Sequence, residues 1–225
     1  MAIRRAREAL GRVFYQRCFY LFIVLIALIA GVPFIETSTH GRMLVASANA
    51  FVVVAAVAAV GRNVLSFVIA LLLAIPALVF HYLGLTSDDP QALVLGWAFG
   101  AALCAATILY LLRYVFQPEV MTADKLYGAA SAYLLIGVLW AYLYALLEFH
   151  SPGAFSDRGE HATGAVIDFL YVSFTVLTTT GLGDVVPITR QARSLCVVEQ
   201  IVGSLFIAIL IARLAGVYPP RRERL

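Results

Sequence analysis

Polar and apolar positions along this chain form long apolar blocks joined by short polar connections. Six blocks approach the ~20 residues that a membrane-spanning helix needs, at residues 18–33, 43–60, 64–83, 92–116, 126–149 and 194–217. A seventh block, residues 165–178, is too short to span and fits a re-entrant helix. The pattern predicts an all-α integral membrane protein with six transmembrane helices and one re-entrant helix.

The composition supports a lipid environment. Hydrophobic residues make up 62% of the chain, charged residues make up 13%, and the mean hydropathy is +0.92. Soluble domains are about half apolar and about a quarter charged. The cysteines Cys18, Cys104 and Cys196 all lie in apolar blocks, so we expect small packed side chains rather than a disulfide framework.

The basic residues predict an orientation. If both termini are cytoplasmic, only Arg42, Arg158, Arg190 and Arg193 of the 16 Lys and Arg residues lie on the outer side. The remaining twelve then lie inside or at the inner border, as the positive-inside rule requires. We therefore expect cytoplasmic termini.

The connection at residues 117–124 is the best internal boundary. Pro118 is expected to end the fourth helix, and Thr122 is placed to cap the fifth. The boundary predicts an N-terminal four-helix transmembrane module, residues 1–117, and a second module, residues 118–225, which carries the re-entrant helix.

The segment from Thr178 to Asp184 reads Thr-Thr-Thr-Gly-Leu-Gly-Asp and joins the re-entrant block to the last apolar block. Non-helical backbone survives at membrane depth only where protein buries it or where it lines a watery cavity. Glycine adopts backbone angles closed to other residues, so successive carbonyl groups can point at one axis. Such carbonyls can replace the hydration shell of a cation. The segment therefore predicts a cation-selectivity filter.

Residues 179–184 resemble the potassium-channel signature Thr-Val-Gly-Tyr-Gly-Asp, and residues 124–217 resemble the two-helix pore domain of that family over its whole length. The resemblance implies a potassium channel of the bacterial six-helix type in the inner membrane, without a recognisable voltage sensor. The implied ion-binding residues are Thr179, Thr180, Gly181, Leu182 and Gly183, with potassium at the first four.

Two positions depart from the usual signature. Thr180 replaces Val or Ile, and Leu182 replaces Tyr or Phe. Thr at the first position also occurs in plant potassium channels, and Gly-Leu-Gly-Asp resembles a second pore loop of some two-pore-domain channels. Leu182 has no phenol to brace the filter from behind, so the resemblance implies conduction more firmly than strict selectivity.

The resemblance also implies residues that support the filter. Tyr171 matches an aromatic residue that bonds Asp184, and Thr175 stands where one bacterial channel has a glutamate facing that aspartate. Thr178 ends the pore helix. Glu199 either bonds a pore-helix Thr behind the filter or faces the cavity, because a membrane-embedded acid is usually functional. Gly203 matches the family's inner-helix hinge glycine, with close helix packing as the alternative.

One chain carries one such loop, and a ring of filter carbonyls needs four, which predicts a homotetramer. Expected partners are further copies of the chain, potassium ions and membrane lipids. We expect no enzyme activity, cofactor or nucleic acid partner. Two alternatives stay open: a poorly selective monovalent cation channel of the same fold, and a secondary transporter with a broken helix. Transporters usually show paired interruptions, and only one is visible here.

Overall fold

Six helices make up most of the structure, which is a computed structural model and describes residues 17–35, 64–87, 89–118, 121–157, 160–161 and 166–217. The helices of this described part are α2 (Arg17–Ile35), α4 (Val64–Thr86), α5 (Pro90–Val115), α6 (Ala123–His150), α7 (Val166–Leu177) and α8 (Arg190–Val217).

Four described helices are long and apolar enough to cross a membrane: Val64–Gly84, Pro90–Val115, Ala123–His150 and Arg190–Ala215. They coincide with four of the predicted spans. The predicted span at 18–33 falls on α2, whose apolar segment Cys18–Gly31 is shorter than these four. The predicted span at 43–60 lies outside the described residues. The chain is therefore a helical membrane protein, and the total of six spans stays a prediction.

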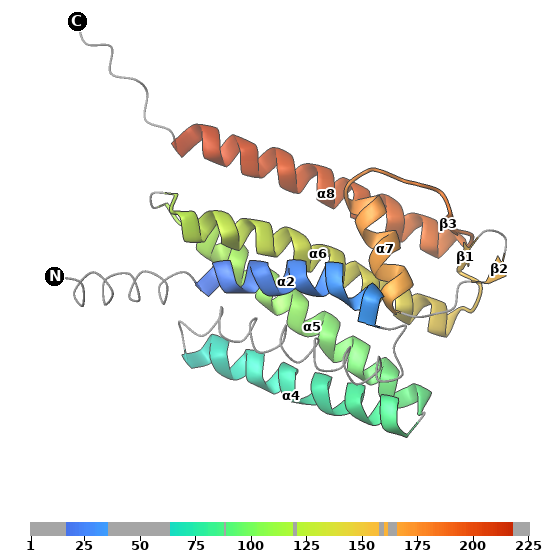
Figure 1. Cartoon of the computed structure of the whole chain (residues 1–225). Coiled ribbons are helices and arrows are strands. Elements are labelled where there is room, and N and C mark those ends of the chain that lie inside the picture. The colour runs from blue at the N-terminus through green and yellow to red at the C-terminus, as the bar shows by residue number, and fades with distance from the viewer. Residues whose placement is uncertain are drawn as a thin grey trace, which may run out of the picture.

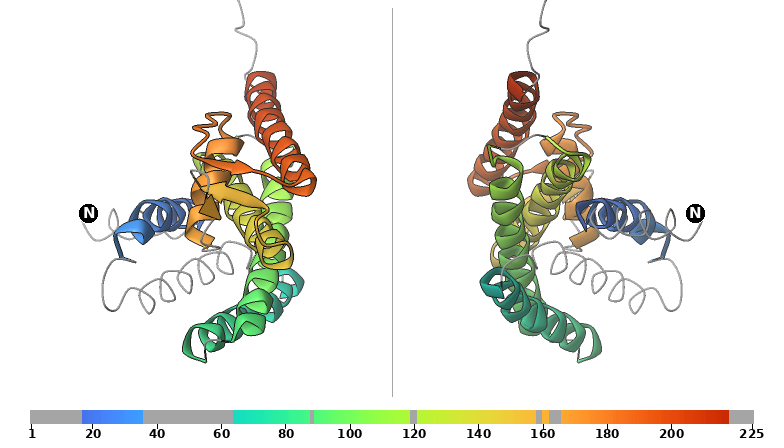
Figure 2. Two further views of the ribbon diagram at one scale, coloured as in Figure 1. Left: turned by 90° about the vertical axis from the view of Figure 1, so that its right-hand side faces the viewer. Right: turned by 90° about the vertical axis from the view of Figure 1, so that its left-hand side faces the viewer.

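The helices are arranged around α6, which contacts α2, α5, α7 and α8. In both directions of view α8 lies at one edge of the molecule and α4 at the opposite edge (Figures 1 and 2). The face of α6 toward its neighbours carries small buried residues, among them Gly128, Ala132 and Ala141. Small residues let helix backbones approach closely, which is how helices pack in a bilayer.

The predicted boundary at residues 117–124 is a break between two helices. α5 ends at Val115, just before Pro118, and α6 begins after Thr122. The Thr122 hydroxyl accepts a hydrogen bond from the Lys125 backbone N–H at 3.3 Å, which confirms the predicted cap.

A small antiparallel sheet, which the sequence did not predict, accompanies the helices of this all-α fold. Its strands are β1 (Phe155–Asp157), β2 (Glu160–His161) and β3 (Val185–Pro187), in the order β2-β1-β3. The chain turns into β1 because the buried Glu148 carboxylate, near the end of α6, accepts bonds from the backbone N–H groups of Gly153 at 2.6 Å and Phe155 at 3.0 Å. Since β3 directly follows Asp184, its pairing with β1 fixes the chain where the predicted filter ends.

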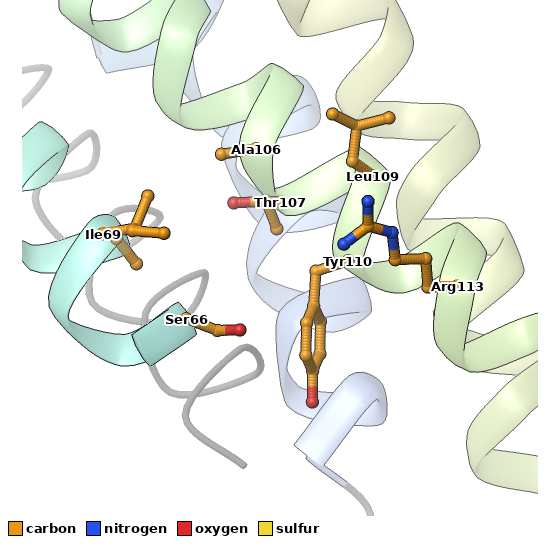
Figure 3. Close-up of a pocket in the computed structure, with 8 residues that line it drawn as sticks. Ser66, Ile69, Ala106, Thr107, Leu109, Tyr110 and Arg113 are labelled. Carbon is orange, nitrogen blue, oxygen red and sulfur yellow. The ribbon is translucent and has the colours of Figure 1, made fainter. Parts of the chain in front are cut away.

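A pocket of about 190 Å³ lies between α4 and α5 (Figure 3). Arg113 lines it from the last turn of α5. The pocket is far along the chain from residues 178–184 and is separate from the site described next.

Candidate functional site

The site is built where α7 ends and the chain turns back as residues 178–184. The turn is tightened by two backbone bonds, from Thr178 N–H to the Phe174 carbonyl at 3.1 Å and from Thr179 N–H to the Val176 carbonyl at 2.9 Å. α7 is apolar, but its 12 residues are too few to span a membrane. Its C-terminal end carries a partial negative charge, which is directed at the loop.

Two consecutive backbone N–H groups of the loop share one acceptor. Thr180 N–H and Gly181 N–H both donate to the Thr175 carbonyl, at 2.9 Å and 3.1 Å. The described chain contains no cis peptide bond, and in a trans peptide the carbonyl points opposite to the N–H. The carbonyl groups of Thr179 and Thr180 therefore both point away from α7.

The backbone φ angle of the loop is positive at every second residue. Thr179, Gly181 and Gly183 have φ angles of 58°, 55° and 78°, in the left-handed region. Successive peptides of mixed handedness align their polar groups on one side, whereas a regular strand alternates them. Glycine adopts such angles at no steric cost, but a β-branched Thr does not, so Thr179 is held against strain of order 1–2 kcal/mol. Strain of this kind is typical of functional sites, which makes Thr179 a candidate site residue.

Threonine hydroxyl groups fix the start of the loop. The Thr178 hydroxyl donates to the Phe174 carbonyl at 2.6 Å and lies 2.8 Å from the Thr180 hydroxyl. The Thr175 hydroxyl donates to the Val172 carbonyl at 2.8 Å, and this residue holds the loop through its backbone carbonyl. Thr175 thus supports the loop, though through a different group than its side-chain position suggested.

Asp184 is tied to α7 across the back of the loop. The Tyr171 hydroxyl donates to Oδ2 of Asp184 at 2.7 Å, and the Val185 N–H donates to Oδ1 at 3.0 Å. The pairing of Tyr171 with Asp184 confirms what the resemblance implied. It closes the loop at its far end, so residues 179–183 are held at both ends.

Glu199 lies behind the loop and is fully buried, with 0% exposure. Its Oε1 lies 2.5 Å from the hydroxyl of Ser173 on α7, and its Oε2 accepts a hydrogen bond from the hydroxyl of Tyr144 on α6. The Ser173 hydroxyl also donates to the carbonyl of Gly137 on α6, at 2.8 Å. Glu199 therefore hydrogen-bonds α7 behind the loop, and its partner there is a serine rather than the threonine that we expected.

Sequence reasoning missed the two partners of Glu199, Tyr144 and Ser173, and the Gly137 carbonyl that Ser173 also contacts. Ser173 and Tyr144 are both buried, at 0% exposure. The sequence did carry a signal for Ser173, which is a hydroxyl residue in the middle of an apolar re-entrant helix. A buried hydroxyl and a membrane-embedded acid such as Glu199 each need a polar partner, so the two could have been paired. Gly137 carried no signal, because it takes part through its backbone carbonyl, and only the packing of α7 on α6 brings that carbonyl to Ser173.

Gly203 lies against the last residue of α7. A Cβ atom built at Gly203 would stand 2.3 Å from the Leu177 carbonyl oxygen and 2.9 Å from Leu177 Cδ1. The same carbonyl accepts a hydrogen bond from the Tyr133 hydroxyl at 3.2 Å. The structure therefore favours close packing as the role of Gly203. The sequence alone did not decide between close packing and a hinge.

Residues 129–218 match a protein family described as ion channel. The matched segment contains most of α6, all of α7, the loop and all of α8. No curated protein and no solved structure gives a significant match to the chain.

Proposed function

We propose that this integral membrane protein is a potassium-selective channel, in which the ion channel segment at 129–218 supplies one quarter of a tetrameric pore. Potassium ions pass along the fourfold axis and are coordinated by the carbonyl groups of residues 179–182. The hydroxyl of Thr179 completes the innermost ion site. Gly183 and Asp184 form the outer mouth.

The observation that carries this proposal is the backbone of the loop. The carbonyl groups of Thr179 and Thr180 point away from α7, because α7 binds the N–H groups on the other side of the same two peptide units. Left-handed φ angles recur at every second residue. Coordination of a dehydrated cation by a column of carbonyl oxygens requires such an arrangement. An ordinary turn between two helices has no need for a strained Thr179.

Exposure in a single chain supports assembly into a tetramer. The loop residues 178–183 are exposed, and the apolar side chain of Leu182 is 63% exposed. The helix α8 also leaves Val197, Ile201 and Leu205 about half exposed. Further copies of the chain around a fourfold axis would cover these apolar surfaces and complete the carbonyl ring.

The organisation around the pore is part of the proposal. Residues 1–117 form a transmembrane module beside the pore module, residues 118–225, and both termini lie in the cytoplasm of a bacterial cell. The distribution of Arg and Lys supports this orientation in the inner membrane. The proposal includes membrane lipids as partners, because α4 exposes Leu65 and Leu72 at 72% and 65%.

A poorly selective cation channel is the second candidate, and Leu182 is the observation that favours it. An aliphatic side chain cannot form the hydrogen bonds with which a phenol would hold the filter width. The two candidates share the pore and differ in whether sodium passes.

Potassium efflux from liposomes that contain the purified protein tests for a pore. The native chain should release potassium faster than protein-free liposomes, and Gly183→Ala should abolish the release, because Ala at a φ of 78° strains the filter backbone. Gly31→Ala is the matched control, since a Cβ there meets nothing within 4 Å. Equal release from native and Gly183→Ala liposomes would exclude this loop as the conduction path.

A further inference from the structure

The number of hydrogen bonds around Glu199 can be compared with the number of protons that the groups there supply. Three oxygen–oxygen contacts join the groups: Tyr144 to Glu199, Glu199 to Ser173, and Ser173 to the Gly137 carbonyl. Each hydrogen bond needs one proton, and a carbonyl can only accept. The hydroxyl groups of Tyr144 and Ser173 supply two protons. The third contact is a hydrogen bond only if Glu199 carries a proton itself.

The surroundings of Glu199 also disfavour a charge. Its side chain is fully buried, and within the described residues no Lys, Arg or His forms an ion pair with it. The ionisable groups that face it are Tyr144 and Tyr133 on α6 and Cys196 on its own helix. An ionised carboxylate that leaves water without a cation is costly, whereas a neutral acid needs only its hydrogen bonds.

We propose that Glu199 acts as a neutral carboxylic acid that positions the pore helix α7. Together with Tyr144, Ser173 and the Gly137 carbonyl it forms a hydrogen-bonded clamp in which every contact has its proton. The Glu199 proton is donated to Ser173, the Ser173 proton to the Gly137 carbonyl, and the Tyr144 proton to Glu199. The clamp joins α6, α7 and α8 at one point. It thereby sets the position of α7, whose Thr175 carbonyl holds the filter N–H groups. Glu199, Ser173 and Tyr144 are positioning residues, and their effect on ions rests on the proposed function.

The neutral form makes a specific prediction for amide replacement. In Glu199→Gln the amide nitrogen can donate to Ser173 while the amide oxygen accepts from Tyr144, so all three hydrogen bonds survive. If Glu199 were instead a carboxylate that accepts from both hydroxyl groups, the amide would lose the charge-assisted bonds. Gln is therefore a mimic of the neutral acid and a poor substitute for the carboxylate.

The test combines infrared spectroscopy with thermal unfolding, on the full chain in lipid at neutral pH. The infrared difference between the native protein and Glu199→Gln should contain the carbonyl band of a protonated carboxylic acid. The unfolding equilibrium should change by less than about tenfold in Glu199→Gln and by more than about tenfold in Ser173→Ala, which leaves the buried Glu199 carboxyl without its partner on α7. Tyr82→Phe, at an exposed position of α4 outside the clamp, is the matched control and should change neither.

A carboxylate band in place of the acid band would overturn the proposal, and so would a Glu199→Gln protein as destabilised as Ser173→Ala. Because the Gln variant keeps the shape of the side chain, the spectroscopic comparison holds even if Ser173→Ala fails to fold. Both readouts are made without ion flow, so they separate failure of the clamp from failure of the proposed channel function.

Discussion

Replacement of Gly203 by Ala places a methyl group against the backbone of α7. The new Cβ would lie 2.3 Å from the Leu177 carbonyl oxygen, whereas ordinary contacts of this kind begin at 3.4 Å. Relief requires a shift of about 1 Å, by the difference of these two distances. The contacting atom belongs to the backbone, so no side-chain rotation can absorb the shift.

The cost of this substitution follows from the packing. Overpacking a close contact costs typically about 1–3 kcal/mol, and here each subunit of the proposed tetramer would bear it. The Leu177 carbonyl accepts from Tyr133 and directly precedes Thr178, so its movement also displaces the start of the filter. We therefore expect Gly203→Ala to destabilise the folded protein and to reduce selective current together.

Thermal stability of the purified protein in detergent, with open probability from single-channel recordings, separates packing from hinge bending. Gly203→Ala should lower the melting temperature clearly, whereas Gly31→Ala, whose Cβ meets no atom within 4 Å, should not. An intact, equally stable protein that shows only a reduced open probability would refute the packing argument and restore the hinge.

Two further predictions concern the filter brace and the response to voltage. Tyr171→Phe removes the donor to Asp184 at 2.7 Å, a charge-assisted bond worth about 1.5–3 kcal/mol, so selectivity should fall and the filter should close more readily in low external potassium. Opening should depend weakly on voltage, because Arg113 is the only Lys or Arg in α4 and α5 and a single charge moved through the full field supplies ~2.3 kcal/mol per 100 mV.

Each of these predictions has a contradicting outcome. Tyr82→Phe is the control for Tyr171→Phe, because Tyr82 is 61% exposed and far from the filter. Equal selectivity of the two variants would show that the bond to Asp184 does not brace the filter. A steep conductance–voltage curve that shifts in Arg113→Gln would contradict the second prediction.

The sequence predicted the elements whose signals are local. Apolar length fixes the helices α4, α5, α6 and α8, and two glycines beside a Thr run mark the loop, since few other residues permit its backbone. The hydroxyl of Thr122 as a cap is likewise a local choice. The pairing of Tyr171 with Asp184 came from the family resemblance rather than from the residues alone.

What the sequence could not predict depends on contacts between distant segments. The left-handed angle at Thr179 opposes the intrinsic preference of threonine and is imposed by the fold around it. The partners of Glu199 lie 26 and 55 residues away, on two other helices. Arg213, whose guanidinium donates to the Gln117 carbonyl at 2.8 Å, is fixed by a contact across 96 residues. The periodicity of apolar residues does not predict such hydrogen bonds between residues that are far apart in the sequence.

The reversal potential with potassium on one side of a bilayer and sodium on the other tests the central claim most directly. Purified protein should give a reversal potential far from zero, at a voltage that holds potassium back on its own side, and swapping the two ions should invert the sign of the reversal potential. A current that reverses near zero in both arrangements would contradict potassium selectivity and identify a poorly selective cation pore.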